Sequence, residues 1–243
     1  MSSLGESYDS WDEYVEDSEL LRAAEEWESS PDSLELSPSV FTQQETSTAP
    51  ASYTNHSGGA NGSDIYWQKM SDRYNVKTVV YSFPGHATNN PYRKVLNKKE
   101  LKDSNMHLSK ANKVLHRKFP TGKNFVDSLL QRNWYQVKNS DAVFAVGKII
   151  RNKMVDGGTG WAVQMAVDNN KSVYVFDCFK NERTGMEEGS CQWFKYDFVR
   201  RMFKFYPGVP ELTHDFAGIG TRALTDKGKF AIEEVFERTF NCK

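Results

Sequence analysis

The distribution of apolar residues divides the chain at about residue 62. Residues 1–62 are rich in Ser, Thr, Glu and Asp. They can bury too little apolar surface to offset the entropy of ordering them, so we predict a disordered acidic tail. Residues 11–27 carry aromatic and aliphatic side chains at loosely helical spacing, and this segment either binds a partner protein, folds back onto the basic part of the chain, or forms only a transient helix. Residues 63–243 are predicted to form one globular domain.

In this domain, short apolar runs alternate with helical patterns. The runs predict strands within residues 77–83, 141–147, 171–177 and 214–224. The helical patterns cover residues 124–140, 161–170, 191–205 and 225–240. The strands are apolar throughout rather than alternately polar, which is typical of a parallel sheet buried on both faces. The pattern therefore predicts an α/β fold with a doubly wound, mostly parallel, Rossmann-like sheet.

Charge is distributed as unevenly as hydrophobicity. Residues 1–60 hold thirteen Asp and Glu against Arg22 alone, a net charge of −12, and the rest holds 30 basic and 19 acidic residues, a net charge of +11. Such asymmetry indicates partners that carry phosphate, and a tail that can compete for the same surface. The segment from Arg93 to Lys123 has ten Lys and Arg residues against two acidic ones, and it forms either a nucleic-acid surface or a solvated helical face.

Several classes of protein are not expected. The acidic N-terminus has no secretory apolar region, and no run approaches the roughly 18 apolar residues of a membrane span. Cys178, Cys191 and Cys242 show no metal-ligand spacing and are expected to be reduced thiols. We therefore predict a cytoplasmic or nuclear protein with no metal and no cofactor.

Small, polar and turn-forming residues follow the predicted strands. In an open parallel sheet, ligands bind outside the carboxyl ends of the strands, where these residues gather. The candidate ligand-binding residues at these ends are Ser82, Gly85, His86, Gly147, Asp177, Gly220, Thr221 and Arg222.

The strongest candidate for a phosphate site consists of Gly157, Gly158, Thr159 and Gly160, here called the 157–160 loop. Consecutive glycines let backbone N–H groups approach an anion, and the helix that follows adds its positive end. The spacing is neither that of a Walker A loop nor that of the dinucleotide fingerprint. The alternative is a tight turn between a strand and a helix.

The other candidates also have two interpretations each. Arg222 either pairs with phosphate or lies on the surface after a turn. His86 acts on a ribose, serves as a general base, or does neither, while Asp177 contacts ribose hydroxyls or caps the next segment. Four aromatic residues either stack on a base or belong to the core: Trp134, Tyr135, Trp161 and Trp193.

Residues 140–177 resemble the SLOG group of Rossmann-like nucleotide-binding domains. That group includes the lonely-guy phosphoribohydrolases, the DNA-processing A proteins and nucleotide-ligand sensors. Residues 216–236 are also similar to the strand, Gly-Ser/Thr-Arg loop and helix of such domains, which commonly come first. Here they come last, so the topology is permuted or this second match is superficial.

The resemblance also bears on catalysis. The lonely-guy motif places a catalytic glutamate where this chain has Gln164, which cannot ionise and cannot act as an acid or base. The resemblance thus implies that the chain binds a nucleotide or nucleotide-derived ligand, as a sensor or a sequestering protein. Two alternatives remain: an N-glycosidase that uses Asp156, Asp177 or His86, and a single-stranded nucleic-acid-binding protein that uses the segment from Arg93 to Lys123.

Overall fold

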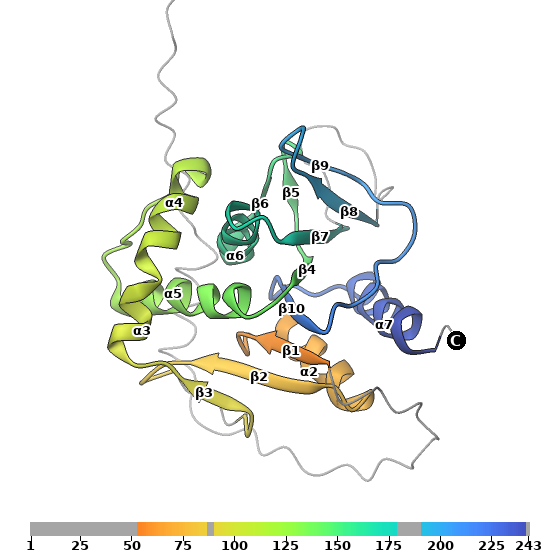
Figure 1. Ribbon diagram of the computed structural model, residues 1–243, viewed down its shortest axis with the longest axis horizontal. Coiled ribbons are helices and arrows are strands. Elements are labelled where there is room, and N and C mark those ends of the chain that lie inside the picture. Colours follow the sequence, from red (N-terminus) through yellow and green to blue (C-terminus); the bar gives the residue numbers. More distant parts are fainter. Residues whose placement is uncertain (1–52, 87–89, 179–190, 242–243) are drawn as a thin grey trace, which may run out of the picture.

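The computed structural model describes residues 53–86, 90–178 and 191–241, so nearly all of the predicted tail lies outside the described residues. An eight-stranded sheet organises this part of the chain in the order β3-β2-β1-β10-β4-β7-β8-β9 (Figure 1). Its strands are β1 Thr54–Ser57, β2 Lys77–Ser82, β3 Arg93–Val95, β4 Ala142–Val146, β7 Ser172–Asp177, β8 Gln192–Asp197, β9 Met202–Phe205 and β10 Asp215–Gly220. A separate two-stranded hairpin joins β5 Ile149–Ile150 to β6 Met154–Val155.

The six strands from β3 to β7 in this order are parallel, and β8 and β9 extend the sheet antiparallel. The prediction of an α/β protein with a mostly parallel sheet is therefore confirmed. The four strands expected from apolar runs correspond to β2, β4, β7 and β10.

Helices cover both faces of the sheet (Figure 1). They are α2 Ser63–Arg73, α3 Lys98–Asp103, α4 Asn105–Leu115, α5 Asn124–Lys138, α6 Gly157–Asp168 and α7 Asp226–Phe240. One apolar cluster lies between the sheet and α3 to α6, and another lies between the opposite face and α2 with α7.

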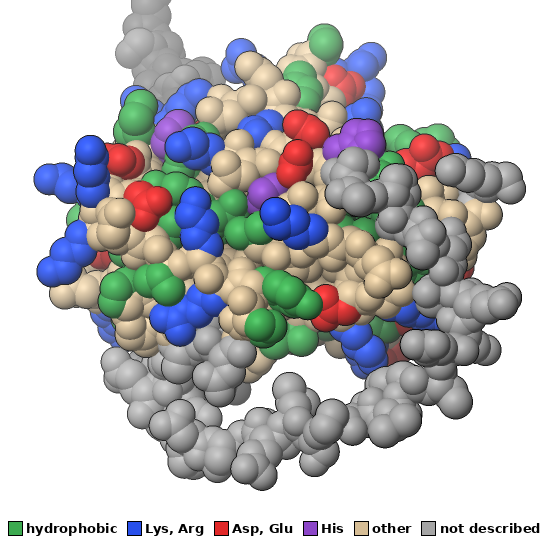
Figure 2. All heavy atoms as spheres, turned by 60° about the horizontal axis from the view of Figure 1, so that its bottom comes forward, with side chains coloured by type: hydrophobic (Ala, Val, Ile, Leu, Met, Phe, Trp, Pro, Cys, Tyr) green, Lys and Arg blue, Asp and Glu red, His purple; other side chains and the backbone are tan. Residues whose placement is uncertain are grey.

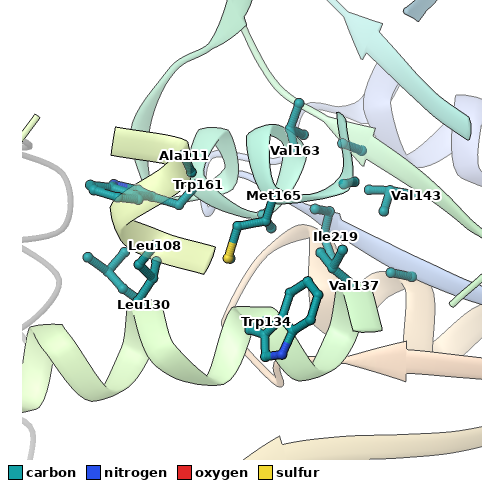
Figure 3. Close-up of a cluster of buried hydrophobic side chains, with 14 of the residues drawn as sticks. Leu108, Ala111, Leu130, Trp134, Val137, Val143, Trp161, Val163, Met165 and Ile219 are labelled. Carbon is teal, nitrogen blue, oxygen red and sulfur yellow. The ribbon is translucent and has the colours of Figure 1, made fainter. Parts of the chain in front are cut away.

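The first of these clusters contains three of the four aromatic residues that had two interpretations: Trp134, Tyr135 and Trp161. Trp134 on α5 and Trp161 on α6 lie among Leu108, Leu130 and Met165 in Figure 3. Tyr135 and Trp193 are buried as well. All four therefore belong to the core, and the stacking interpretation is wrong for the structure described.

The predicted boundary at residue 62 is wrong, because β1 precedes it and pairs with both β2 and β10. This strand is polar, yet Asn55, His56 and Ser57 are buried. Asn55 donates to Ser71 Oγ at 3.1 Å, and its Oδ1 accepts from Gly218 N at 3.2 Å. Burial of these groups is tolerated because hydrogen bonds satisfy them. A search for apolar runs cannot find such a strand.

The helix predicted over residues 191–205 is also wrong. The segment forms β8 and β9, with pairs such as Phe194 to Phe205 and Tyr196 to Phe203. Its aromatic residues favour a strand, and cross-strand contacts between them stabilise the hairpin. Tyr196 lies 5.2 Å from Phe203 between ring centroids.

The expectation of reduced thiols is corrected for two of the three cysteines. Cys178 and Cys191 form a disulfide. The pairing of Asp177 with Gln192 at the start of the β7–β8 pair places the two cysteines opposite each other. Cys242 lies outside the described residues.

Candidate functional site

The order of the strands reverses near the middle of the sheet. From β1 the chain proceeds through β2 to β3 in one direction, whereas β4 and β7 lie on the opposite side, with β10 inserted between β1 and β4. In open α/β sheets, ligands bind at such a reversal, outside the carboxyl ends of the strands. The loops after β1, β2, β10 and β4 all lie at this rim.

A glycine-rich loop that lies within the predicted tail occupies the centre of the rim. Residues 58–62 (Gly-Gly-Ala-Asn-Gly), here called the 58–62 loop, connect β1 to α2. Gly62 is the N-cap residue of α2 and has no side chain to cap it. The positive end of α2 is therefore directed to this loop without a side-chain cap from residue 62.

Three predicted site residues lie beside the 58–62 loop. The backbone N–H of Ser63 donates to the Thr221 carbonyl at 3.1 Å, and Ser63 Oγ donates to the same oxygen at 2.8 Å. The N–H of Gly220 donates to Asp64 Oδ1 at 3.2 Å. A Cβ at Gly62 would overlap the backbone of Arg222. The loops after β1 and β10 thus form one unit.

A buried ion pair lies beneath the 58–62 loop. Asp64 on α2 and Arg132 on α5 are 4% and 5% exposed, and their Oδ2 and Nη1 atoms are 3.9 Å apart. Burial raises the pKa of Asp64 and lowers that of Arg132, and in each case the opposite charge of the partner opposes the shift. Neither charge is therefore stable at this depth without the other.

Arg132 occupies the space that a side chain at residue 58 would need. A Cβ at Gly58 would overlap the guanidinium group, so glycine is required there for the observed approach. Arg132 Nη1 donates to Gln136 Oε1 at 2.8 Å. Arg132 Nε and Gln136 Nε2 are buried, and neither has a hydrogen-bond partner among the residues that the structure describes.

His86, after β2, lies in the same positive field. Burial, followed by the charges of Arg132, Arg93 and Arg222, lowers the pKa of His86 to about 3. The imidazole is therefore neutral at physiological pH. Its Nδ1 is 3.1 Å from Ser82 Oγ, and its ring stacks on Phe83 with centroids 4.9 Å apart.

A chain of amide side chains connects the 58–62 loop to the segment before β3. Gln68 Nε2 donates to Ser57 Oγ at 2.7 Å, and Asn90 Nδ2 donates to Gln68 Oε1 at 2.6 Å. Ser57 Oγ also accepts from Gly59 N at 3.2 Å. These bonds fix the first half of the loop relative to α2.

The 157–160 loop has a different geometry. Asp156 is the N-cap of α6, and its Oδ1 accepts from Gly157 N at 2.8 Å. Arg117 donates to the carbonyls of Gly157 and Val155 at 2.7 and 3.1 Å. The carboxylate of Asp156 thus already occupies the N-terminus of α6, where an anion would bind. The buried Arg117 stabilises the loop by donating to its carbonyls.

Gly160 accounts for the shape of this loop. A Cβ at this position would overlap the Val155 carbonyl oxygen, so β6 and α6 can approach each other only with glycine. This geometry favours the tight turn, and the phosphate cradle of Gly157, Gly158, Thr159 and Gly160 stays a prediction.

The remaining predicted residues lie near the 157–160 loop. Gly147 follows β4, and a Cβ there would contact Val155 and Thr159. Asp177 ends β7, and its Oδ2 accepts from Ile149 N at 2.9 Å, which connects the β5–β6 hairpin to the sheet. Gln164 Nε2 donates to Asp168 at 2.9 Å, one turn further along α6.

The predicted residues therefore form two neighbouring groups on one rim. Gly220, Thr221 and Arg222, at and after the end of β10, contact the 58–62 loop and the start of α2, and His86, which contacts Ser82 at the end of β2, is affected by the charge of Arg132 beneath this loop. Gly85 lies next to His86 in the chain. The 157–160 loop collects Gly147 and Asp177. Residues 58–62, Asp64 and Arg132 were not predicted as site residues from the sequence. Glycines followed by a helical pattern were the signal for the loop, whereas nothing local marks Arg132.

The basic segment from Arg93 to Lys123 forms β3, α3, α4 and the loop after them. Its lysines at positions 98, 99, 102, 110 and 113 are exposed. Figure 2 shows several Lys and Arg side chains, with few acidic ones between them, on the side of the molecule where α3 and α4 lie in Figure 1. Both interpretations of this segment stay predictions.

Two searches of the described ranges were negative. No helix there is both long and apolar enough to cross a membrane. No group of three or more His, Cys, Asp or Glu residues there is arranged to hold a metal ion.

Comparisons of the chain with protein-family models, with curated proteins and with solved structures gave no match. The fold and the rim define the class of the protein: an α/β protein with a mostly parallel sheet and two glycine-rich loops at the carboxyl ends of its strands. The resemblance to the SLOG group stays a prediction.

Proposed function

We propose that this protein binds a nucleotide or nucleotide-derived ligand at the carboxyl ends of β1, β2 and β10, as a sensor or sequestering protein with a Rossmann-like fold of the SLOG kind. The phosphate binds at the 58–62 loop, with Thr221 and Arg222 beside it. The observation that carries this proposal is the N-terminus of α2, which has a glycine N-cap and no side-chain cap, at the reversal of the strand order.

Charge supports the same position. The charges of Arg93, Arg132 and Arg222 all lower the pKa of His86. The carboxylate of Asp64 opposes the lowering of the pKa of Arg132. A neutral His86 adds no further charge but offers a ring near the loop. Backbone N–H groups, a helix N-terminus and arginine are the groups that bind phosphate in proteins.

Thermal unfolding in the presence of nucleotides tests the proposal. A ligand that binds the folded state at 100 times its Kd stabilises it by about 2.7 kcal/mol, which raises the melting temperature by several degrees. A panel of nucleoside monophosphates, diphosphates and triphosphates with NAD is the first screen. If no member of the panel raises the melting temperature, the proposal is wrong.

A pair of variants locates the ligand. Gly59 has φ of +70°, a conformation that Asp tolerates better than most residues, and Gly59→Asp places a carboxylate in the 58–62 loop. Gly158→Asp places one in the 157–160 loop. We expect the first variant to abolish the nucleotide shift and the second to keep it. The reverse result would move the phosphate site to the 157–160 loop.

Single-stranded nucleic-acid binding is a second candidate, favoured by the exposed lysines of α3 and α4. It predicts an affinity for single-stranded oligonucleotides that falls steeply with salt, and further when Lys98, Lys99, Lys110 and Lys113 are neutralised. Affinity that is independent of salt would exclude it. The hydrolase hypothesis has less support, since Asp156 and Asp177 each already accept a backbone N–H, from Gly157 and from Ile149. Release of free base from nucleotides is its test.

A further inference from the structure

The outward face of α4 carries apolar and basic side chains together. Met106 and Val114 are 71% and 43% exposed, and Lys110 and Lys113, which lie between them in the chain, are exposed as well. These positions share one side of the helix, because residues four and seven apart lie close together on a helix surface. The inward residues of α4 pack in the first apolar cluster. The surface that the outward residues form with the exposed lysines of α3 is here called the α3–α4 face, and it consists of Lys98, Lys99, Lys102, Met106, Lys110, Lys113 and Val114.

The α3–α4 face is positively charged. Its five lysines are accompanied on α3 and α4 by two acidic residues, Glu100 and Asp103, which leaves a net charge of +3. The carboxylate of Glu100 accepts from Asn97 N at 2.8 Å, and Lys110 donates to the backbone carbonyl of Asp168 at 2.7 Å. Among the described residues, no carboxylate forms an ion pair with any of the five lysines. The described part of the chain therefore leaves the positive charge of this face unbalanced.

Residues 11–27 of the same chain are complementary to the α3–α4 face. They contain seven acidic residues against Arg22 alone, a net charge of −6. Apolar side chains, among them Leu20, Leu21 and Trp27, alternate with the acidic ones. Exposed ion pairs contribute little each, so a stable contact needs apolar groups on both sides as well. The face and the segment each supply both kinds of group, with opposite charges.

The chain between the two is long enough to bring them together. Residues 28–52 separate the segment from Tyr53, which directly precedes β1. Fully extended, these residues span up to about 85 Å. A domain of this size has a radius of gyration of about 16 Å, so every part of its surface is within reach. Because the segment and the face belong to one chain, their effective concentration is high, which favours a contact made of weak interactions.

We infer that residues 11–27 bind the α3–α4 face of their own molecule. Their carboxylates pair with the lysines of this face, and their apolar side chains cover Met106 and Val114. A polyanion that uses the same lysines has to displace the segment first, so the contact restrains binding at this face. The inference does not depend on the nucleotide site at the 58–62 loop, and either proposal can fail without the other.

Photo-cross-linking in the full chain tests this contact. Benzoylphenylalanine, which on irradiation reacts with neighbouring C–H bonds, replaces Met106 in one protein and Phe230 in another. Phe230 is the matched control, because it is 60% exposed and lies on α7, which covers the opposite face of the sheet and has a net charge of −1. We expect cross-links to residues 11–27, measured by mass spectrometry, to be at least about fivefold more abundant from position 106 than from position 230.

Three outcomes would overturn the inference. Equal yields from the two positions would show that the segment does not select this face. Cross-links from position 106 that never reach residues 11–27 would leave the lysines to nucleic acid or to solvent. Cross-links that join two chains would assign the segment to a second copy of the protein.

Variants in the full chain separate the apolar from the electrostatic part of the contact. With the probe at position 106, Leu20→Ser combined with Leu21→Ser should lower the yield at least about fivefold, because the apolar contact is lost. Leu34→Ser combined with Leu36→Ser makes the same change outside the segment and should leave the yield within about twofold. Lys98→Gln, Lys99→Gln and Lys113→Gln together should lower the yield about threefold or more, because the charge of the face falls from +3 to zero. A wild-type yield in the leucine or the lysine variant would contradict the inference.

Discussion

The 58–62 and 157–160 loops contain the same kinds of residue in different arrangements. The 58–62 loop joins β1 to α2, whereas residues 157–160 form the first turn of α6 after β6, and each has glycines, an aspartate at the helix start and a buried arginine. In the 157–160 loop, Asp156 accepts from the helix backbone and Arg117 donates to two loop carbonyls. In the 58–62 loop, Asp64 also accepts from backbone N–H groups, those of Gly58, Ala60 and Gly220, but it is buried inside the helix, and Arg132 Nε has no partner in the described ranges.

This difference shows how the same residues serve a turn in one place and a candidate site in the other. A loop whose own side chains saturate its backbone has little capacity left for a ligand. The 58–62 loop differs in that the buried cation beneath it keeps a donor without an acceptor among the described residues. Glycine count alone does not distinguish the two.

The largest expected effect comes from the two aspartates. Asp64→Ala leaves Arg132 buried without its counter-charge and should lower the free energy of unfolding by about 3–5 kcal/mol. Asp156→Ala removes an N-cap whose carboxylate is half-exposed, and should cost about 1 kcal/mol. Urea unfolding of both variants measures the difference. Equal losses would mean that the two loops do not differ in the way described.

Substitution of glycines in the 157–160 loop gives the next largest expected effect on stability. Gly160→Ala should lower the free energy of unfolding by about 2–3 kcal/mol, because the new Cβ overlaps the Val155 carbonyl and the backbone must shift. Gly158→Ala in the same helical turn is the control and should change it by less than about 1 kcal/mol. Thermal unfolding is the measurement. A stable Gly160→Ala protein would contradict the interpretation of this loop as a tight turn.

Lowering the pH should destabilise the protein through His86, which lies on the same side of the rim as the 58–62 loop. His86 is neutral in the folded state, with a pKa of about 3, but takes up a proton below about pH 6.5 when unfolded. Its contribution is complete above pH 6.5 and is lost as the pH falls, by about 2 kcal/mol at pH 5. Burial lowers the pKa of His56 as well, which acts in the same direction.

Urea unfolding at pH 7 and pH 5 checks this expectation. His86→Gln should flatten the dependence relative to the wild type, because glutamine does not titrate. An unchanged pH dependence in this variant would show that His86 does not cause it.

The fold was predictable where burial and apolar composition coincide. β2, β4, β7 and β10 were found because their residues are apolar on both faces, and α6 and α7 because their starts and ends carry clear signals. β1 was missed because its buried residues are polar and depend on partners distant in sequence, such as Ser71, Tyr81 and Asp215. β8 and β9 were taken for a helix because aromatic residues spaced through a basic segment fit either period.

The candidate site was predictable only in part, for the same physical reason. Residues that follow apolar strands, such as His86, Thr221 and Arg222, could be assigned to the rim from the sequence. Arg132 could not, because it lies mid-helix on α5 and its role depends on Gly58, which is 74 positions away. The pattern of apolar residues predicts which side chains are buried, whereas contacts between segments distant in sequence determine which buried charge is paired.

The substitution with the smallest expected effect on stability is the one that tells the most about function. Arg222 is exposed, so Arg222→Gln should change the free energy of unfolding by no more than about 0.5 kcal/mol. If the phosphate binds at the 58–62 loop, the same variant should weaken nucleotide binding about tenfold, because a charge-assisted bond to phosphate is lost. Lys148→Gln, after β4 on the side of the 157–160 loop, is the matched control and should leave binding within about twofold. A larger loss in Lys148→Gln than in Arg222→Gln would assign the ligand to the 157–160 loop and reverse the roles of the two loops.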